Sequence, residues 1–251
     1  MKLLSLVLIL LFSLKVSADS PTIAVATNFN HAMNSIVNSF EDKYKIKIQV
    51  SYGSTGSLYA QILNGAPFDA FFSADTKTID LILDNELGLE NSPFIYAMGT
   101  LAFICNSCPK EKLWSDTLRT TSGKIAIANP KLAPYGQAAK EALGKLKKTS
   151  KIDERLVYGS NVGQAFQFVE SGNIPFGLVA HSLAVAGKIN KERYQIISKK
   201  LYTPIEQSAV ILKRTKNLNS MKTFFNYLKS DEVSSIIKKF GYKMKESSSV
   251  K

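Results

Sequence analysis

Four short segments of small polar residues and glycine could together bind an anion. Each lies between a run typical of a β-strand and a run typical of a helix. The unpaired N–H groups and the dipole of a helix N-terminus favour negative charge, and glycine lets the backbone approach a ligand closely. Ser, Thr and Asn cap helices in most proteins, so one such segment says little, but four of them favour an anion site. The segments are 26–28 (ATN), 53–57 (GSTGS), 129–136 (NPKLAPYG) and 159–163 (GSNVG).

The charges in these segments narrow the choice of anion. None contains Arg, His, Asp or Glu, and the single charge, Lys131, is expected to face outward. Neutral donors suit an oxyanion that is fully ionised near neutral pH, such as molybdate, tungstate or sulfate. Phosphate keeps a proton and would gain from a carboxylate acceptor, and ferric iron needs a cluster of Tyr, His or carboxylate ligands. We therefore predict an oxyanion site without direct metal ligands.

Motifs for catalysis are missing from the sequence. Residues 53–57 do not have the spacing of a G-x-S-x-G nucleophile turn, and HExxH, P-loop and dinucleotide motifs do not occur. His31 and His181 belong to no recognisable nucleophile motif. The sequence therefore favours a binding protein without a cofactor over an enzyme.

The N-terminus predicts export. Lys2 precedes an apolar run at 3–14, and small residues at 16–18 suit a cleavage site before Asp19. The run is shorter than the roughly 20 apolar residues of a membrane span. We expect residues 1–18 to be a signal peptide and the mature protein to be free in the periplasm, since no cysteine lies at the cleavage site that could carry a lipid anchor.

The cysteines and the net charge fit an exported protein. Cys105 and Cys108 (CNSC) could form a redox or metal site in the cytosol, but they follow a strand-like run and no second pair completes a zinc site. A local disulfide is expected, because the periplasm permits it. The net charge of +12 comes from scattered lysines without interleaved aromatic residues. Solvated helix faces explain it better than a nucleic-acid partner.

Strand-like and helix-like runs alternate along the chain and predict an α/β fold. Such alternation produces parallel sheets covered by helices, and the units are too many for one small sheet. We predict two lobes, 19–98 plus 205–251 and 99–204, joined by crossing strands that act as a hinge. Ligands of such sheets bind beyond the carboxyl ends of the strands, here in a cleft between the lobes. Strands are expected at 22–26, 46–52, 68–72, 94–104, 124–128, 156–158, 176–180, 194–197 and 208–212, and helices at 29–40, 57–63, 76–85, 138–146, 162–169, 218–228 and 233–240.

These pieces together resemble one known family across nearly the whole mature chain. The matching segments are 26–29 with 32–33, 53–58, 62–69, 72–75, 127–136, 139–143, 175–179 and 240–241, together with Val162. The chain resembles the periplasmic molybdate-binding proteins of ABC importers, which have the two-lobed type II periplasmic binding fold. The resemblance implies a monomer that binds molybdate or tungstate in the interlobe cleft and docks on a membrane permease. The alternative is a binder of sulfate or another small oxyanion on the same fold.

The resemblance also implies a set of donors. Thr27 and Asn28 correspond to the first turn, and Ser54 or Thr55 to the second. Tyr135 and the backbone N–H of Val162 would donate from the other lobe. Some relatives have a ligand tyrosine after the strand at 176–179, where this chain has an alanine. Tyr135 is expected to replace that group from across the cleft.

Overall fold

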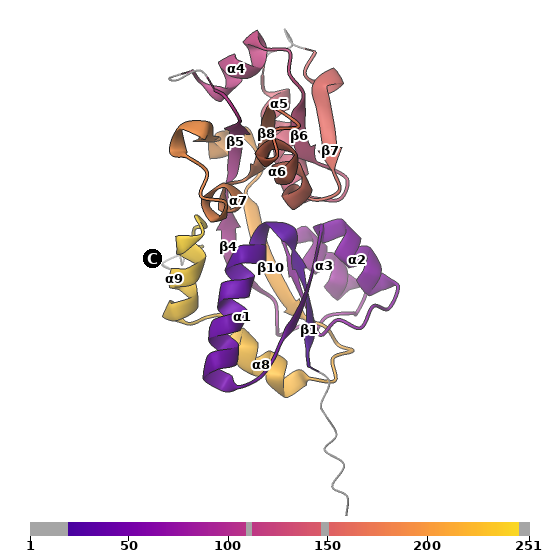
Figure 1. The fold of residues 1–251 in the computed structure, drawn as a ribbon. Coiled ribbons are helices and arrows are strands. Elements are labelled where there is room, and N and C mark those ends of the chain that lie inside the picture. The colour runs from indigo at the N-terminus through magenta and orange to yellow at the C-terminus, as the bar shows by residue number, and fades with distance from the viewer. Residues whose placement is uncertain (1–19, 109–111, 147–150, 246–251) are drawn as a thin grey trace, which may run out of the picture.

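The fold is described by a computed structural model that covers residues 20–108, 112–146 and 151–245. The predicted signal peptide (1–18) lies outside these residues. Two five-stranded sheets, each covered by helices, form two lobes stacked end to end (Figure 1). The predicted two-lobed α/β architecture is confirmed. Within the described residues, every helix is too short or too polar to cross a bilayer.

The first lobe is built on a sheet of strand order β2-β1-β3-β10-β4. Its first three strands are parallel, and β10 is antiparallel to both of its neighbours. The buried faces of α1, α8 and α9 pack on one side of this sheet, and those of α2 and α3 on the other. The elements are β1 (Thr22–Ala26), η1 (Thr27–Phe29), α1 (Asn30–Tyr44), β2 (Gln49–Gly53), α2 (Thr55–Leu63), β3 (Ala70–Ser73), α3 (Lys77–Asp84), β4 (Phe94–Gly99), β10 (Ile205–Ile211), α8 (Leu218–Tyr227) and α9 (Asp231–Lys239).

The second lobe repeats this plan with strand order β7-β6-β8-β5-β9. Strands β7, β6 and β8 are parallel, and β5 is antiparallel to β8 and β9. A single apolar core joins the sheet to its helices. The elements are β5 (Leu101–Cys105), α4 (Trp114–Thr120), β6 (Ile125–Ala128), α5 (Pro134–Gly144), η2 (Asp153–Arg155), β7 (Leu156–Gly159), α6 (Val162–Glu170), β8 (Phe176–Ala180), α7 (His181–Ala186), η3 (Lys191–Arg193), β9 (Tyr194–Ile196) and η4 (Lys199–Leu201).

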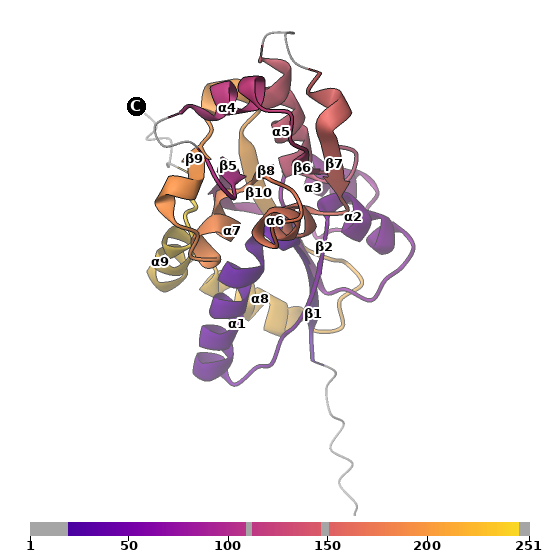
Figure 2. The ribbon, with the colours of Figure 1, turned by 45° about the horizontal axis from the view of Figure 1, so that its top comes forward.

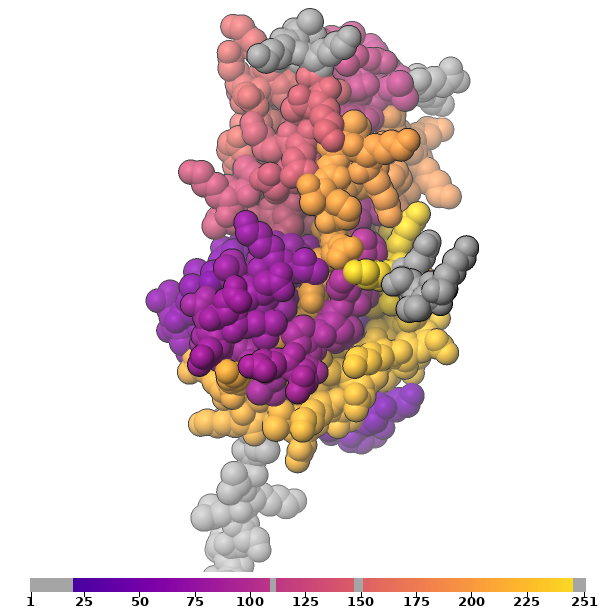
Figure 3. Space-filling view, turned by 180° about the vertical axis from the view of Figure 1, so that it is seen from behind, coloured from indigo at the N-terminus to yellow at the C-terminus, as the bar shows by residue number. Residues whose placement is uncertain are grey.

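Two extended connections cross between the lobes. Strand β4 of the first sheet runs through Thr100 into β5 of the second, and the chain returns through 202–204 into β10. The predicted strand at 94–104 is therefore two strands in different sheets. At the junction, β4 and β10 are paired, with Gly99 opposite Ile205, so the two connections lie side by side (Figure 2). The view from behind shows the lobes as upper and lower masses that touch across the waist of the molecule (Figure 3).

The clearest differences from the sequence prediction concern helices α4, α5 and α7; in addition, α1 ends later, at Tyr44, and α2 begins earlier, at Thr55. Helix α5 begins at Pro134 and not at Ala138, because proline is well suited to the first helical position. Tyr135 therefore lies in the first turn of a helix and not in a loop. Helices α4 and α7 were not predicted. Both have fewer than eight residues, too few to show an apolar period.

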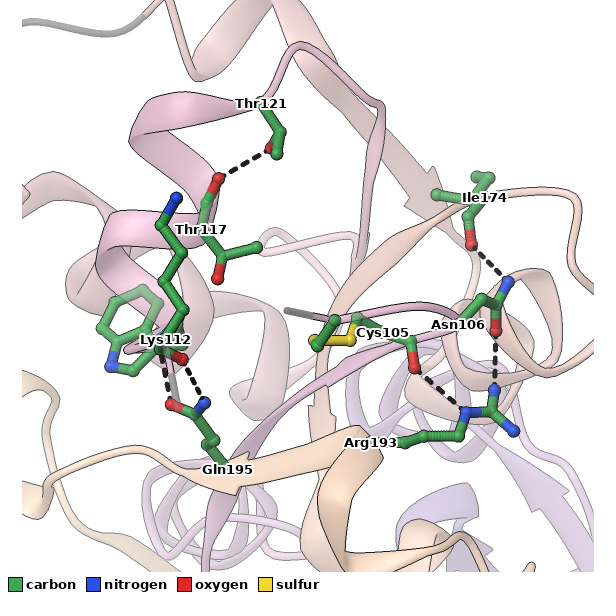
Figure 4. Close-up of a disulfide and its surroundings, with 10 residues drawn as sticks. Cys105, Asn106, Lys112, Thr117, Thr121, Ile174, Arg193 and Gln195 are labelled. Carbon is green, nitrogen blue, oxygen red and sulfur yellow. Dashed lines mark hydrogen bonds between the residues drawn. A yellow bond between two sulfur atoms is a disulfide. The ribbon is translucent and has the colours of Figure 1, made fainter. Parts of the chain in front are cut away.

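The disulfide between Cys105 and Cys108 (Figure 4) lies at the end of β5 opposite its junction with β4. Arg193 holds this end by donating from Nε to the Cys105 carbonyl and from Nη2 to Asn106 Oδ1. Changing both cysteines to serine is expected to lower the free energy of unfolding by about 2 kcal/mol, since the bridge closes only a short loop. Urea unfolding measures this loss. Ligand affinity is expected to stay within a factor of about two, and a larger change would contradict this placement.

Candidate functional site

A small cavity lies where the carboxyl ends of the parallel strands of the two lobes face each other. Its volume is about 10 Å³, close to what one water molecule needs and far below the several hundred Å³ of a drug-sized pocket. All six predicted donors lie on its wall. The lining residues are Ala26, Thr27, Asn28, Gly53, Ser54, Thr55, Ala74, Ala133, Pro134, Tyr135, Asn161 and Val162.

The two side chains of the first turn already bind other protein groups. Thr27 Oγ1 donates to the Gly53 carbonyl at 2.9 Å. Asn28 Nδ2 donates to Gln207 Oε1 at 2.7 Å and to the Tyr242 hydroxyl at 3.1 Å. A carboxamide nitrogen has two hydrogens and a hydroxyl has one, so these side chains have no donor left for a ligand. The backbone N–H groups at the start of η1 are the donors that this turn offers.

The second turn offers a hydroxyl and a backbone N–H. Thr55 Oγ1 accepts from the Ala74 N–H at 3.0 Å, which fixes the oxygen and leaves its own hydrogen free to donate. Ser54 caps α2, and its Oγ accepts from the Ser57 N–H at 3.3 Å and lies 2.6 Å from Ser57 Oγ. Since Thr55 is the first residue of α2, its N–H has no carbonyl one turn back.

Tyr135 is the contribution of α5 from the second lobe. Its hydroxyl accepts from Gln207 Nε2 at 3.4 Å. Burial raises the pKa of Tyr135 well above its usual range, with the nearby tyrosines adding to the effect, so the hydroxyl stays neutral and keeps its hydrogen. The N–H of this residue, second in α5, also lacks an intrahelical partner.

Val162 begins α6, and the cap of this helix leaves its N–H free. Asn161 Oδ1 accepts from the Gln164 N–H at 3.0 Å, and Gln164 Oε1 accepts from the Ser160 N–H at 2.6 Å. These bonds pair the N–H groups of Ser160 and Gln164 on either side of Val162, and they fix the direction of the Val162 N–H. Helix α6 contacts η1 of the other lobe, and a Cβ on Gly163, in the first turn of α6, would lie 2.5 Å from Thr27 Cγ2.

A buried polar cluster behind the cavity was missed by the sequence analysis. Gln207 Oε1 accepts from Asn28 and, at 3.1 Å, from the Tyr96 hydroxyl, and Ser182 and Tyr242 bond to Asn28. Gln207 could have been noticed as a polar residue beside an apolar strand, but the predicted strand began one residue later, at Ser208. Ser182 lies in the short helix that the pattern did not show.

None of the described residues that line the cavity is charged. Two broader grooves flank it, of about 600 Å³ and 560 Å³, and they hold the neighbouring charges. Asp75, Glu141 and Lys131 line the first groove, and Lys131 is exposed as predicted. Among the described residues, no three His, Cys, Asp or Glu side chains gather as metal ligands would. The site can therefore hold a small anion by neutral hydrogen-bond donors from both lobes.

Comparison with known proteins shows the family to which the chain belongs. The bacterial extracellular solute-binding protein family matches residues 21–243. The chain is 34% identical over 238 residues to the molybdate-binding protein ModA of Rhodobacter capsulatus, covering 95% of this chain and 94% of that protein. A putative ABC transporter substrate-binding lipoprotein of Bacillus subtilis, YvgL, is 31% identical over 226 residues, or 88% of this chain and 85% of that protein.

Among solved structures, the periplasmic molybdate-binding protein of Azotobacter vinelandii superposes with a TM-score of 0.84 at 32% identity. The match covers 89% of this chain and 99% of that chain. The family match spans both lobes and every residue on the cavity wall. The chain therefore belongs to the bacterial extracellular solute-binding proteins.

Proposed function

We propose that this protein captures molybdate, and with it tungstate, and delivers the anion to the permease of an ABC importer. One observation carries the proposal: a small uncharged cavity lies where the N-termini of helices from two lobes converge. Such termini favour a dianion and need no positive side chain. The relatives named for molybdate binding have the same two-lobed fold over almost the whole chain.

The free donors of the wall define how the anion would be held. The first lobe offers the N–H groups at the start of η1, the Thr55 hydroxyl and the Thr55 N–H. The second lobe offers Tyr135 and the Val162 N–H. Hydrogen bonds from neutral donors to a charged oxygen are stronger than those between neutral groups, and closure of the lobes removes competing water. Ser54 supports this arrangement as the cap of α2.

We propose that the protein captures its ligand without catalysis. The wall of the cavity offers donors, but no carboxylate or imidazole that could transfer a proton to or from a bound group. The membership in a solute-binding family supports the same conclusion. We propose that the protein acts in the periplasm as a monomer, without a cofactor, and that the loaded closed form docks on the permease.

Calorimetric titration with molybdate, tungstate, sulfate and phosphate tests the proposal. Molybdate and tungstate have nearly the same size and are expected to bind alike. Sulfate is smaller, so it cannot reach every donor at once, and its Kd is expected to be at least about 100-fold higher, the effect of losing one or two charge-assisted hydrogen bonds. Sulfate bound as tightly as molybdate would favour the alternative, a general or sulfate-binding protein on this fold. Absence of binding by all four anions would overturn the proposal.

A further inference from the structure

A set of hydrogen bonds joins the two lobes behind the cavity, away from the anion. Ser182 Oγ, from α7 of the second lobe, donates to the Asn28 carbonyl of the first lobe at 2.9 Å. The Tyr242 hydroxyl donates to the same carbonyl at 2.6 Å and lies 2.9 Å from Ser182 Oγ. All three residues are at least nine-tenths buried. We call Ser182, Tyr242 and the Asn28 carbonyl the rear cluster.

The rear cluster contacts the cavity through one residue. Asn28 lines the cavity, and its backbone N–H is one of the free donors there, while its carbonyl and side chain face the rear cluster. Tyr242 belongs to the same lobe as Asn28 and can keep its bond whether the lobes are open or closed. Ser182 belongs to the other lobe, so we expect its bond to Asn28 to break when the cleft opens.

The C-terminal segment that contains Tyr242 is anchored on the hinge. The Met98 N–H donates to the Lys243 carbonyl at 2.7 Å, and the Lys243 N–H donates back at 3.1 Å, which ties the segment to β4. Gly241, with a φ of +79°, makes the turn that leads into it. The Gly241 carbonyl lies 3.3 Å from Nδ1 of His181, the neighbour of Ser182 on α7. The segment therefore presents a fixed surface to the other lobe.

We infer that Ser182 and Tyr242 form a latch that stabilises the closed form and slows ligand release without touching the ligand. A bond that exists only in the closed form adds its free energy to that form alone, so it shifts the open–closed equilibrium. Both are positioning residues: they hold Asn28, whose N–H faces the cavity. The inference rests on the proposed function only in using molybdate as the probe.

Ser182→Ala tests the latch, with Ser208→Ala as the matched control. Ser208 is also buried and its Oγ donates to a carbonyl, that of Phe94, but both groups belong to the first lobe. Ser182→Ala is expected to raise the molybdate Kd about two- to tenfold, the effect of one net hydrogen bond, mainly through a faster dissociation rate. Ser208→Ala is expected to leave both quantities within a factor of about two. Equal effects of the two variants would overturn the latch.

A double-mutant cycle separates the latch from a general loss of packing. If Ser182 and Tyr242 act on one carbonyl, Ser182→Ala combined with Tyr242→Phe should raise Kd by less than the product of the two single effects. A multiplicative result would show two independent contributions and would contradict a shared latch. Thermal unfolding without ligand should change little in Ser182→Ala, because its bond joins two lobes and not the core of either one.

Distances between two spin labels test the latch even if the protein does not bind molybdate. Exposed Lys47 and Glu170 lie on different lobes and can each carry one label. Ligand-free Ser182→Ala is expected to show a smaller closed fraction in the distance distribution than the wild-type protein. If no oxyanion binds the wild-type protein, the proposed function falls, while this comparison still decides the latch. Identical distributions would overturn it.

Discussion

Replacing Val162 by proline is expected to raise the molybdate Kd by one to two powers of ten. Proline at this position removes the backbone N–H that faces the cavity and little else. Val162 is the first residue of α6, where proline is tolerated, and Asn161 before it is extended (φ −150°, ψ 174°), as a residue before proline prefers. A hydrogen bond to a charged group contributes about 1.5–3 kcal/mol, which corresponds to this change in Kd. Isothermal titration measures it.

Two controls isolate the lost N–H from other effects of proline. Val162→Ala shortens the side chain but keeps the donor, so its Kd should stay within a factor of about three, the effect of a minor loss of packing. Asp231→Pro places proline at the first position of α9, after an extended Ser230 and far from the cavity, and should not change Kd. If Val162→Ala weakened binding as much as Val162→Pro, the backbone donor would not be what holds the anion.

Much of the fold could be predicted because buried strands leave a local signal. Thr22–Ala26 and Phe176–Ala180 have the predicted limits, since each is a short, mainly apolar run between a proline and a polar residue. Helix α5 shows a feature that an apolar pattern does not predict. Its start was placed at the first residue of an apolar period, whereas Pro134 begins it four residues earlier. A helix start depends on backbone geometry that proline supplies and an apolar period does not show.

The six site residues gather around one cavity, because strand ends and helix starts determine where they lie. Their chemical roles could not be predicted in the same way. The amide of Asn28 is taken by Gln207 and Tyr242, which are 179 and 214 residues away in the sequence. Periodicity describes neighbours on one element and contains no information on such distant partners. The sequence therefore predicted which residues line the cavity, and only the structure shows which of their hydrogens are already bonded within the protein.

Adding one methyl group at Gly163 is expected to weaken molybdate binding by about ten- to a hundredfold. A Cβ there would lie 2.5 Å from Thr27 Cγ2 of the opposite lobe, so the closed form could not be reached without a shift. Thr27 cannot easily rotate away, because its Oγ1 is bonded to the Gly53 carbonyl. Overpacking of this kind costs about 1–3 kcal/mol. Titration of Gly163→Ala measures the loss, and an unchanged Kd would show that the lobes close less tightly.

The stability of the ligand-free protein is not expected to fall in Gly163→Ala. Measuring it therefore separates an effect on closure of the lobes from a loss of stability. Alanine forms helix better than glycine, by up to about 1 kcal/mol, so Gly163→Ala should unfold at the same urea concentration or higher. Gly144→Ala, at the end of α5 with no atom within 4 Å of the added Cβ, is the control that leaves binding unchanged.

Thr27→Ser removes the opposing Cγ2 but keeps the hydroxyl that bonds to Gly53. It should restore most of the affinity that Gly163→Ala loses, whereas serine at 27 alone should have little effect. Such a rescue is expected only if the Cβ added at position 163 acts through its clash with Thr27 across the cleft. It would show that the affinity depends partly on how closely the two lobes can approach each other, since neither methyl group can form a hydrogen bond to the anion. Without rescue, the glycine would act on α6 itself and not on closure.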